Sequence, residues 1–106
     1  MYKHMNIHSC EHFFKNFSDR TRLAIITSLI EKPLSVNEIV EKTRNEQSNV
    51  SHQLKKLVHC KILLSERQGK RKIYSLNNKT ISPILEAAFN HTKMNCQNTC
   101  NIQKND

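Results

Sequence analysis

Apolar residues recur at three- and four-residue spacing in five stretches of the chain, and this spacing predicts five helices. Two shorter apolar runs flank a basic segment that holds the only glycine, which predicts a β-hairpin. The expected elements are helices at residues 4–17, from 19 towards Pro33, from 36, at 47–59 and from Ser82 onward, and strands at 62–65 and 72–76. The pattern therefore predicts an α+β fold that is mostly helical.

Three of the expected helices begin with residues that favour a helix start. Ser18 is placed to cap the second helix, and the adjacent Asp19 suits the positive end of the helix dipole. Ser35 and Glu38 have the spacing of a capping box, in which each side chain bonds the other's backbone N–H. Ser82 followed by proline is typical of a cap and a first helical turn.

Each helix carries an apolar stripe, and we expect the stripes of the second and third helices to be buried. The stripes are Ile7, Cys10, Phe13, Phe14 and Phe17; Leu23, Ile26, Leu29 and Ile30; Val36, Ile39 and Val40; Val50, Leu54 and Leu57; and Ile84, Leu85, Ala88 and Phe89. The central helices and the hairpin already make a compact unit. The first and last helices then have apolar residues that this unit does not bury, so we expect these helices to pack on their copies in a two-fold dimer.

The fourth helix is polar on the face opposite its apolar stripe, and that face has no acidic residue. Gln, Ser, Asn, His and Lys side chains suit base edges and phosphates. A polar helix beside a basic hairpin is the arrangement with which a winged helix-turn-helix binds duplex DNA. The residues that we expect at DNA are Gln47, Ser48, Asn49, Ser51, His52, Lys55, Lys56, Arg67, Lys70 and Arg71.

Charge is concentrated in the same part of the chain. The net charge is +8 over 106 residues. Residues 42–72 hold nine cations and two acids, a local charge of +7, which favours a polyanionic partner. No apolar run reaches the length of a membrane span, and the N-terminus lacks the apolar core of a secretory signal. We therefore expect a cytoplasmic protein with reduced thiols, folded as one domain over residues 1–95 with a polar, cysteine-bearing tail at 96–106.

The remaining function classes fit the sequence less well. There is no glycine-rich phosphate loop, nucleophile elbow or paired-carboxylate motif, so we expect no enzyme. A winged helix used only as a protein-interaction module would not need the polar face of the fourth helix. An RNA-binding module would be expected to carry an aromatic stacking pair on a strand, and none is present.

Three segments resemble one protein family. They are FSDRTRL at residues 17–23, QSNVSHQLKKL at 47–57 and ERQGKRKIYSL at 66–76. In this order they are similar to the second helix, recognition helix and wing of the ArsR/SmtB family of metal-responsive repressors, and the resemblance spans about residues 13–90. It implies a dimeric repressor that leaves its operator when an inducer binds. Two positions where the family usually has glycine are filled by Asn45 (or Arg44) and by Lys61, so we expect a strained Lys61 or a different end to the fourth helix.

The resemblance also suggests where an inducer would bind. Ser35 and Asn37 replace the thiols of the family's third-helix site. The family's last-helix site keeps His91, whereas Asn78, Thr80 and Met94 replace its other ligands. Cys60 resembles the cadmium- and lead-sensing branch, which has a thiol there and another in the tail. With Cys96 and Cys100 it would make a three-thiolate site for Cd(II), Pb(II), Zn(II) or As(III), although Lys56 replaces that branch's second cysteine.

Other interpretations of the cysteines stay open at this point. Cys10, near His8 and His12, would be a further ligand or a separate site, and both Cys10 and Cys60 also fit as small buried residues. A thiol-based redox or sulfur sensor, or a regulator without a small inducer, is the alternative to metal sensing. We expect a DNA-binding transcriptional repressor, released by a thiophilic ion and requiring no cofactor.

Overall fold

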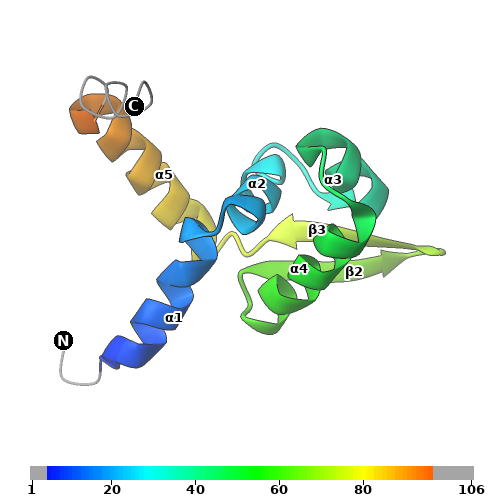
Figure 1. Cartoon of the computed structure of the whole chain (residues 1–106), viewed down its shortest axis with the longest axis horizontal. Helices are drawn as coiled ribbons and strands as arrows, with labels where there is room; N and C mark the ends of the chain where they lie inside the picture. The colour runs from blue at the N-terminus through cyan, green and yellow to red at the C-terminus, as the bar shows by residue number, and fades with distance from the viewer. Residues whose placement is uncertain (1–4, 97–106) are drawn as a thin grey trace. The chain divides into compact units, whose positions relative to one another are not determined.

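The computed structural model describes residues 5–96, with only the backbone for Cys96. The elements are α1 (Ile7–Ser18), α2 (Arg20–Ser28), β1 (Leu34–Ser35), α3 (Val36–Thr43), α4 (Gln47–His59), β2 (Leu63–Gln68), β3 (Arg71–Leu76), α5 (Ile81–His91) and a π-helical turn (Thr92–Cys96). The five predicted helices and the hairpin are confirmed (Figure 1). The two-residue strand β1 and the extension of β2 to Gln68 were not predicted.

The sheet is antiparallel with strand order β1-β3-β2. Leu34 pairs with Tyr74 in β3, and Gln68 pairs with Arg71 across the hairpin. The hairpin therefore turns on two residues, Gly69 and Lys70. Gly69 has a φ of +63°, a conformation that glycine adopts without the steric cost of a Cβ. This is the physical reason why the only glycine of the chain lies at the tip of the wing.

The chain divides into two compact units after Leu76. The first unit holds α1 to β3, and α2 contacts both α3 and α4. Its buried apolar residues are Ile25, Ile26, Leu29, Leu34, Ile39, Val50, Leu54, Leu57, Ile62, Leu63, Tyr74 and Leu76. The prediction that Leu23 and Ile30 are buried was wrong, because both are exposed. Helix α2 ends at Ser28, well before Pro33, so Ile30 no longer follows the helical stripe, and Ile25 is buried instead.

The helix starts differ in part from the sequence prediction. Asp19, not Ser18, caps α2, and its Oδ2 accepts from the N–H of Arg22 over 2.9 Å. The capping box of Ser35 and Glu38 is present at α3. Helix α5 begins at Ile81, so the predicted start at Ser82 was wrong. Pro83 lies third in the helix, still within the first turn, where a missing N–H breaks no intrahelical bond.

Within residues 5–96, two non-glycine residues are left-handed, as the missing glycines of the sequence suggested. Arg44, rather than Asn45, has a φ of 57° at the end of α3. Lys61 has a φ of 61° just after α4. The N–H of Lys61 donates to the carbonyl of Val58, and that of Ile62 donates to Leu57, which is the hydrogen-bond pattern of a Schellman motif. Helix α4 therefore ends as it would with glycine, and Lys61 carries the strain of a left-handed Cβ.

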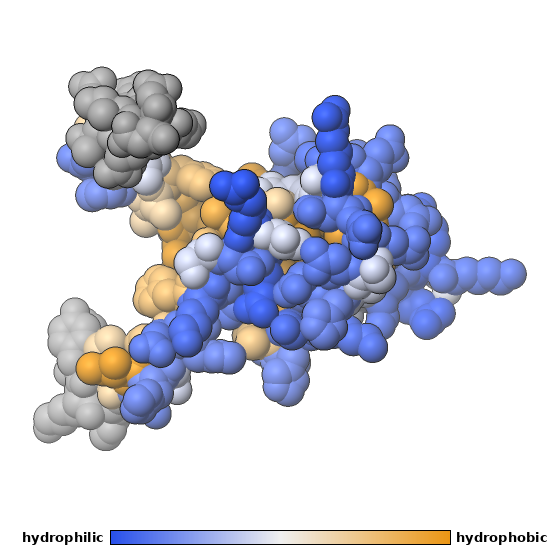
Figure 2. Space-filling view, viewed as in Figure 1, coloured by the Kyte–Doolittle hydropathy of each residue, from blue (hydrophilic) through white to orange (hydrophobic). Residues whose placement is uncertain are grey.

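Apolar side chains stay at the surface on α1 and, considered separately, on α5 (Figure 2). On α1, Ile7 is 79% exposed and Phe14 is 57% exposed. In the second unit, Leu85 is buried, whereas Phe89 is 47% exposed. Among the described helices none is long and apolar enough to cross a membrane.

Candidate nucleic-acid interface

Helix α4 presents the predicted polar face. Its apolar stripe of Val50, Leu54 and Leu57 is buried. The side chains expected at DNA are exposed at Gln47, Ser48, Asn49, His52, Lys55 and Lys56, and half-buried at Ser51. No side-chain oxygen caps the start of α4, so its first backbone N–H groups remain open to an anion such as a phosphate.

The hairpin of β2 and β3 carries the second basic surface, with Arg67, Lys70 and Arg71 all exposed. Figure 2 shows the hairpin tip as hydrophilic. Arg71, which directly follows the hairpin turn, forms an exposed ion pair with α3, with its Nη2 3.1 Å from Glu38 Oε1. Glu38 has a pKa below its ordinary value, chiefly because its carboxylate accepts from the Ser35 N–H; the Ser35 side chain and Arg71 lower this pKa further.

Two surface grooves join α4 to the wing. One, of about 420 Å³, is lined by residues of α3, by Gln47 and by Lys70, Arg71 and Lys72. The other, of about 270 Å³, lies between α4 and the sheet and is lined by Lys55 and Lys72 among others. The first groove also holds Glu38 and Glu41, so its lining is mixed in charge, and Lys72 is the residue that the two grooves share. The start of α4 and its lysine-bearing face therefore both border the basic residues of the wing.

A chain of hydrogen bonds ties α4 to α2 and α1. Arg22 Nε donates to Gln53 Oε1 over 2.7 Å, and Arg22 Nη1 donates to Asn16 Oδ1 over 3.0 Å. Gln53 Nε2 donates in turn to Asn49 Oδ1 over 3.4 Å. Asn16 is buried and also donates to the carbonyls of His12 and Phe13. We call Asn16, Arg22, Gln53 and Asn49 the polar chain.

Sequence reasoning missed the polar chain. Gln53 lies on the polar side of α4, but it is half-buried and accepts a hydrogen bond from Arg22. Asn16 gave the only signal, because it is a polar residue among the phenylalanines of the first helix. The partners come from three helices, so spacing along the sequence could not have paired them.

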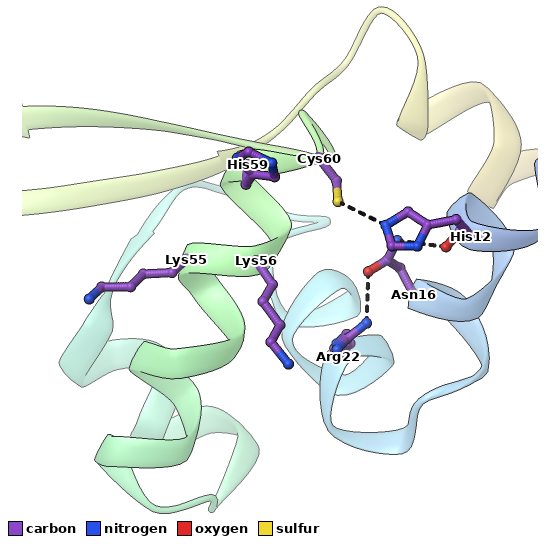
Figure 3. Close-up of a pocket in the computed structure, with 7 residues that line it drawn as sticks. All are labelled: His12, Asn16, Arg22, Lys55, Lys56, His59 and Cys60. Atoms are coloured by element: carbon purple, nitrogen blue, oxygen red, sulfur yellow. Dashed lines mark hydrogen bonds between the residues drawn. The ribbon is translucent and has the colours of Figure 1, made fainter. Parts of the chain in front are cut away.

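The structure describes the side chains of two of the four cysteines that the sequence predicts as metal ligands, Cys10 and Cys60. Cys60 is half-buried at the end of α4, and its Sγ lies 3.8 Å from Nε2 of His12 in α1 (Figure 3). Cys10 is half-buried. The Cys96 side chain and all of Cys100 lie outside the described residues. Among the residues that are described, no three His, Cys, Asp or Glu side chains are grouped to hold a metal ion, so Cys10 forms no such group with its neighbouring histidines.

Cys60 and His12 border an open hollow of about 510 Å³. Its other lining residues are Asn16, Arg22, Lys55, Lys56 and His59. The hollow therefore lies beside the polar chain, between α1 and the second half of α4, and none of the described residues that line it carries a carboxylate. Sequence reasoning named both Cys60 and His12 but did not place them together.

Comparison with known proteins agrees with this geometry. The model for "Bacterial regulatory protein, arsR family" matches residues 19–65. The transcriptional regulator NmtR of Mycobacterium tuberculosis is 36% identical over 73 residues, covering 69% of this chain and 61% of its own length. KmtR of the same organism is 31% identical, over 73% of this chain and 60% of its own length. The chain thus spans less than two thirds of these two relatives.

A third relative is matched over more of its length. The uncharacterised regulator Rv0081 of M. tuberculosis is 32% identical over 72% of this chain and 68% of its own. Its crystal structure superposes with a TM-score of 0.79, covering 91% of this chain and 98% of that one, at 26% identity. The solution structure of apo-NmtR gives a TM-score of 0.69 at 28% identity, over 85% and 78% of the two chains. The chain belongs to the ArsR family of bacterial regulatory proteins.

Proposed function

We propose that this protein is a sequence-specific, duplex-DNA-binding transcriptional repressor of the cytoplasm. The observation that carries the proposal is the exposed, acid-free face of α4 connected by two grooves to a basic wing. Gln47, Ser48 and Asn49 in the first turn would read base edges, with Ser51 and His52 following. The cations of α4 and the wing would contact phosphates or the adjacent minor groove. Relatives named as HTH-type transcriptional regulators support this class of function.

The proposed working unit is a homodimer. Large apolar side chains are exposed on α1 and, considered separately, on α5, and pairing with a second copy would cover such side chains. A structural neighbour from Mycobacterium bovis is described as a homodimeric winged helix-turn-helix domain. Two-fold pairing would set the recognition helices about 34–36 Å apart, one turn of B-DNA, and would match a palindromic operator.

The DNA assignment is tested by replacing both Ser51 and His52 with alanine. We expect this double variant to lose operator binding in a fluorescence anisotropy titration while remaining a dimer by sedimentation. His91→Ala, which removes an exposed imidazole of α5, is the matched control and is expected to bind DNA normally. Unchanged DNA binding by the Ser51/His52 variant would refute the assignment.

We further propose that a thiophilic ion such as Cd(II), Pb(II), Zn(II) or As(III) releases the DNA. Cys60 supports this, because its partly exposed thiol stands at the end of the recognition helix. Cys96, Cys100 and Cys10 remain further ligands proposed from the sequence. An ion that binds the DNA-incompetent state better must itself be bound more weakly when DNA is present. Converting nearly full occupancy into nearly full release needs a preference of about 5.5 kcal/mol.

The inducer is tested by adding a panel of these ions to the reduced protein–operator complex. We expect at least one ion to release the DNA and Cys60→Ser to abolish that response. Release by an oxidant or polysulfide alone would favour the thiol-redox alternative. Failure of every ion and oxidant would instead indicate a regulator without a small inducer.

A further inference from the structure

We propose that the hollow between α1 and the second half of α4 binds a phosphate of the DNA backbone, through Arg22, Lys56 and His12. The residues that α1 and α2 bring to this hollow are not among those expected at DNA from the sequence. The proposal rests on the proposed DNA-binding function, and it extends the protein–DNA interface beyond the recognition helix and the wing. The hollow would position the duplex and would not read its bases.

The charge of the hollow is positive. Arg22, Lys55 and Lys56 line it, and none of the described lining residues carries a carboxylate. The two helices beside it add little negative charge, because α4 has no acidic residue and α1 has only Glu11, which pairs with Lys15 over 3.6 Å. A concave surface with one sign of charge concentrates ions of the opposite sign, so the hollow favours an anion.

Arg22 is held at the hollow by neutral partners. Its Nε donates to Gln53 over 2.7 Å, and its Nη1 donates to the buried Asn16 over 3.0 Å. Amide oxygens orient the guanidinium, but they do not cancel its charge. The Asp19 carboxylate accepts from the backbone N–H of Arg22 and does not line the hollow. The guanidinium thus presents a positive charge in a fixed orientation, which suits the recognition of a phosphate.

Lys56 brings a second cation from α4 to the same hollow. Figure 3 shows its side chain extending on the side of Arg22, whereas Lys55 extends the other way. Two like charges that face one hollow repel each other, and a phosphate between them would replace this repulsion with two charge-assisted hydrogen bonds. The exposed imidazole of His12 supplies a further N–H donor from α1.

The position of the hollow along α4 suits a phosphate at the edge of the major groove. Lys56 lies nine residues after Gln47, which is about 13.5 Å along the helix axis at 1.5 Å per residue. The major groove of B-DNA is about 12 Å wide. When the first turn of α4 lies in this groove, the second half of the helix is therefore near a sugar–phosphate wall. Lys55 lines both the hollow and the groove that holds Lys72 of the wing, so the hollow continues the proposed DNA surface.

The openness of the hollow favours a DNA phosphate over a free anion. Contacts between exposed charges are weak in water and are screened by salt, so a free anion gains little affinity there. A phosphate of a duplex that α4 and the wing already hold is presented at a high effective concentration. The same weak contacts then add to the affinity for DNA.

The test is a charge substitution at His12, whose side chain is exposed and takes no part in the polar chain. Glutamate is a good helix former, so His12→Glu should fold. Its carboxylate would pair with Arg22 or Lys56 and exclude the phosphate. The matched control is His8→Glu, which makes the same charge change one turn earlier on α1, at an exposed position outside the hollow.

We expect His12→Glu to weaken binding of duplex DNA at least about tenfold more than His8→Glu does, in fluorescence anisotropy at fixed salt. The slope of log K against log salt concentration should also fall by up to about 1.8 in the dimer, because each protomer loses one phosphate contact worth about 0.9. Unrelated duplexes should be affected as much as the operator, since a phosphate contact carries no sequence information.

A second measurement locates the phosphate on the DNA. Uncharged methylphosphonates replace the phosphates of an operator duplex one at a time. We expect one position in each half-site at which this replacement weakens binding by the parent protein and by His8→Glu, but not by His12→Glu, which has already lost that contact.

The outcomes separate this site from the proposed function. Equal effects of the two substitutions, or no methylphosphonate position that distinguishes them, would overturn the phosphate site and leave the DNA-binding proposal intact. Micromolar binding of inorganic pyrophosphate to the DNA-free protein, lost in His12→Glu, would assign the hollow to a small anion and also overturn it. A protein that ignores duplex DNA even at low salt would refute both proposals.

Discussion

The hydrogen bond between Arg22 and Gln53 gives the sharpest quantitative prediction. It joins α2 to the recognition helix over 2.7 Å, and both residues are half-buried. We predict that Gln53→Leu, which removes the acceptor and keeps the bulk, destabilises the protein. Gln53→Glu is the control, because it keeps an acceptor for Arg22 while adding an acid to the DNA face. It should fold as stably as the parent but bind DNA more weakly.

The magnitude follows from the partners. A hydrogen bond to a charged group is worth about 1.5–3 kcal/mol, and partial exposure places this one near the lower end, at about 1.5 kcal/mol. Arg22→Met should cost more, about 3 kcal/mol, because it also removes the donor to the buried Asn16 and leaves that oxygen unpaired. The double variant should cost about 3 kcal/mol rather than the sum of about 4.5, since the shared bond is lost only once.

The assay is urea unfolding of the four proteins in a double-mutant cycle. Protein concentration is held fixed, because the stability of a dimer depends on it. We expect a coupling energy of about 1.5 kcal/mol between Arg22 and Gln53. Additive effects within about 0.3–0.5 kcal/mol would mean that the two residues are energetically independent, and the polar chain would then have no structural role.

Three further predictions concern the helix end, the capping box and the wing. Lys61→Gly should raise the free energy of unfolding by about 0.5–1 kcal/mol in urea. Glycine relieves about 1–2 kcal/mol of left-handed strain and costs about 0.5–1 kcal/mol in backbone entropy. A loss of stability would contradict the strain argument. The pKa of Glu38 is lowered from its ordinary value of 4.5, so ionised Glu38 stabilises the fold at a pH above 4.5, and this stabilisation is lost as the pH falls further. Glu38→Gln should therefore flatten the acid side of a plot of stability against pH. An unchanged plot would show that Glu38 does not contribute. The double variant Lys70→Ala with Arg71→Ala should weaken binding to all DNA sequences. It should also reduce the slope of log K against log salt concentration by up to about 3.6, because a dimer loses up to four phosphate contacts, each worth about 0.9 of slope. An unchanged slope would place the wing away from DNA.

The sequence was sufficient for features that depend on local spacing. Apolar periodicity predicted the five helices, and the single glycine between basic residues predicted the hairpin tip. The strained Lys61 was also expected, because a helix end that needs a left-handed residue forces that conformation on whichever residue stands there. The polar face of α4 followed from its residue types and the helical period alone.

Two kinds of feature could not be predicted from the sequence. Some depend on tertiary contacts, and others depend on a choice between neighbouring residues with equal local propensity. Ser18 and Asp19 are both good caps, so propensity does not choose between them. Pro83 fits several positions of a first turn, so it does not fix where α5 begins. Strand β1 is too short to show a period. The Cys60–His12 contact joins residues 48 positions apart, and no local pattern marks such a pair.

The most direct test of the central claim is an amide-resolved NMR titration of the labelled protein with its operator duplex. The basic surface of α4 and the wing predicts that shift changes concentrate at residues 47–56 and 67–72, with one duplex bound per dimer. Changes confined to α5, or no change at stoichiometric duplex in low salt, would contradict the assignment of this surface to DNA.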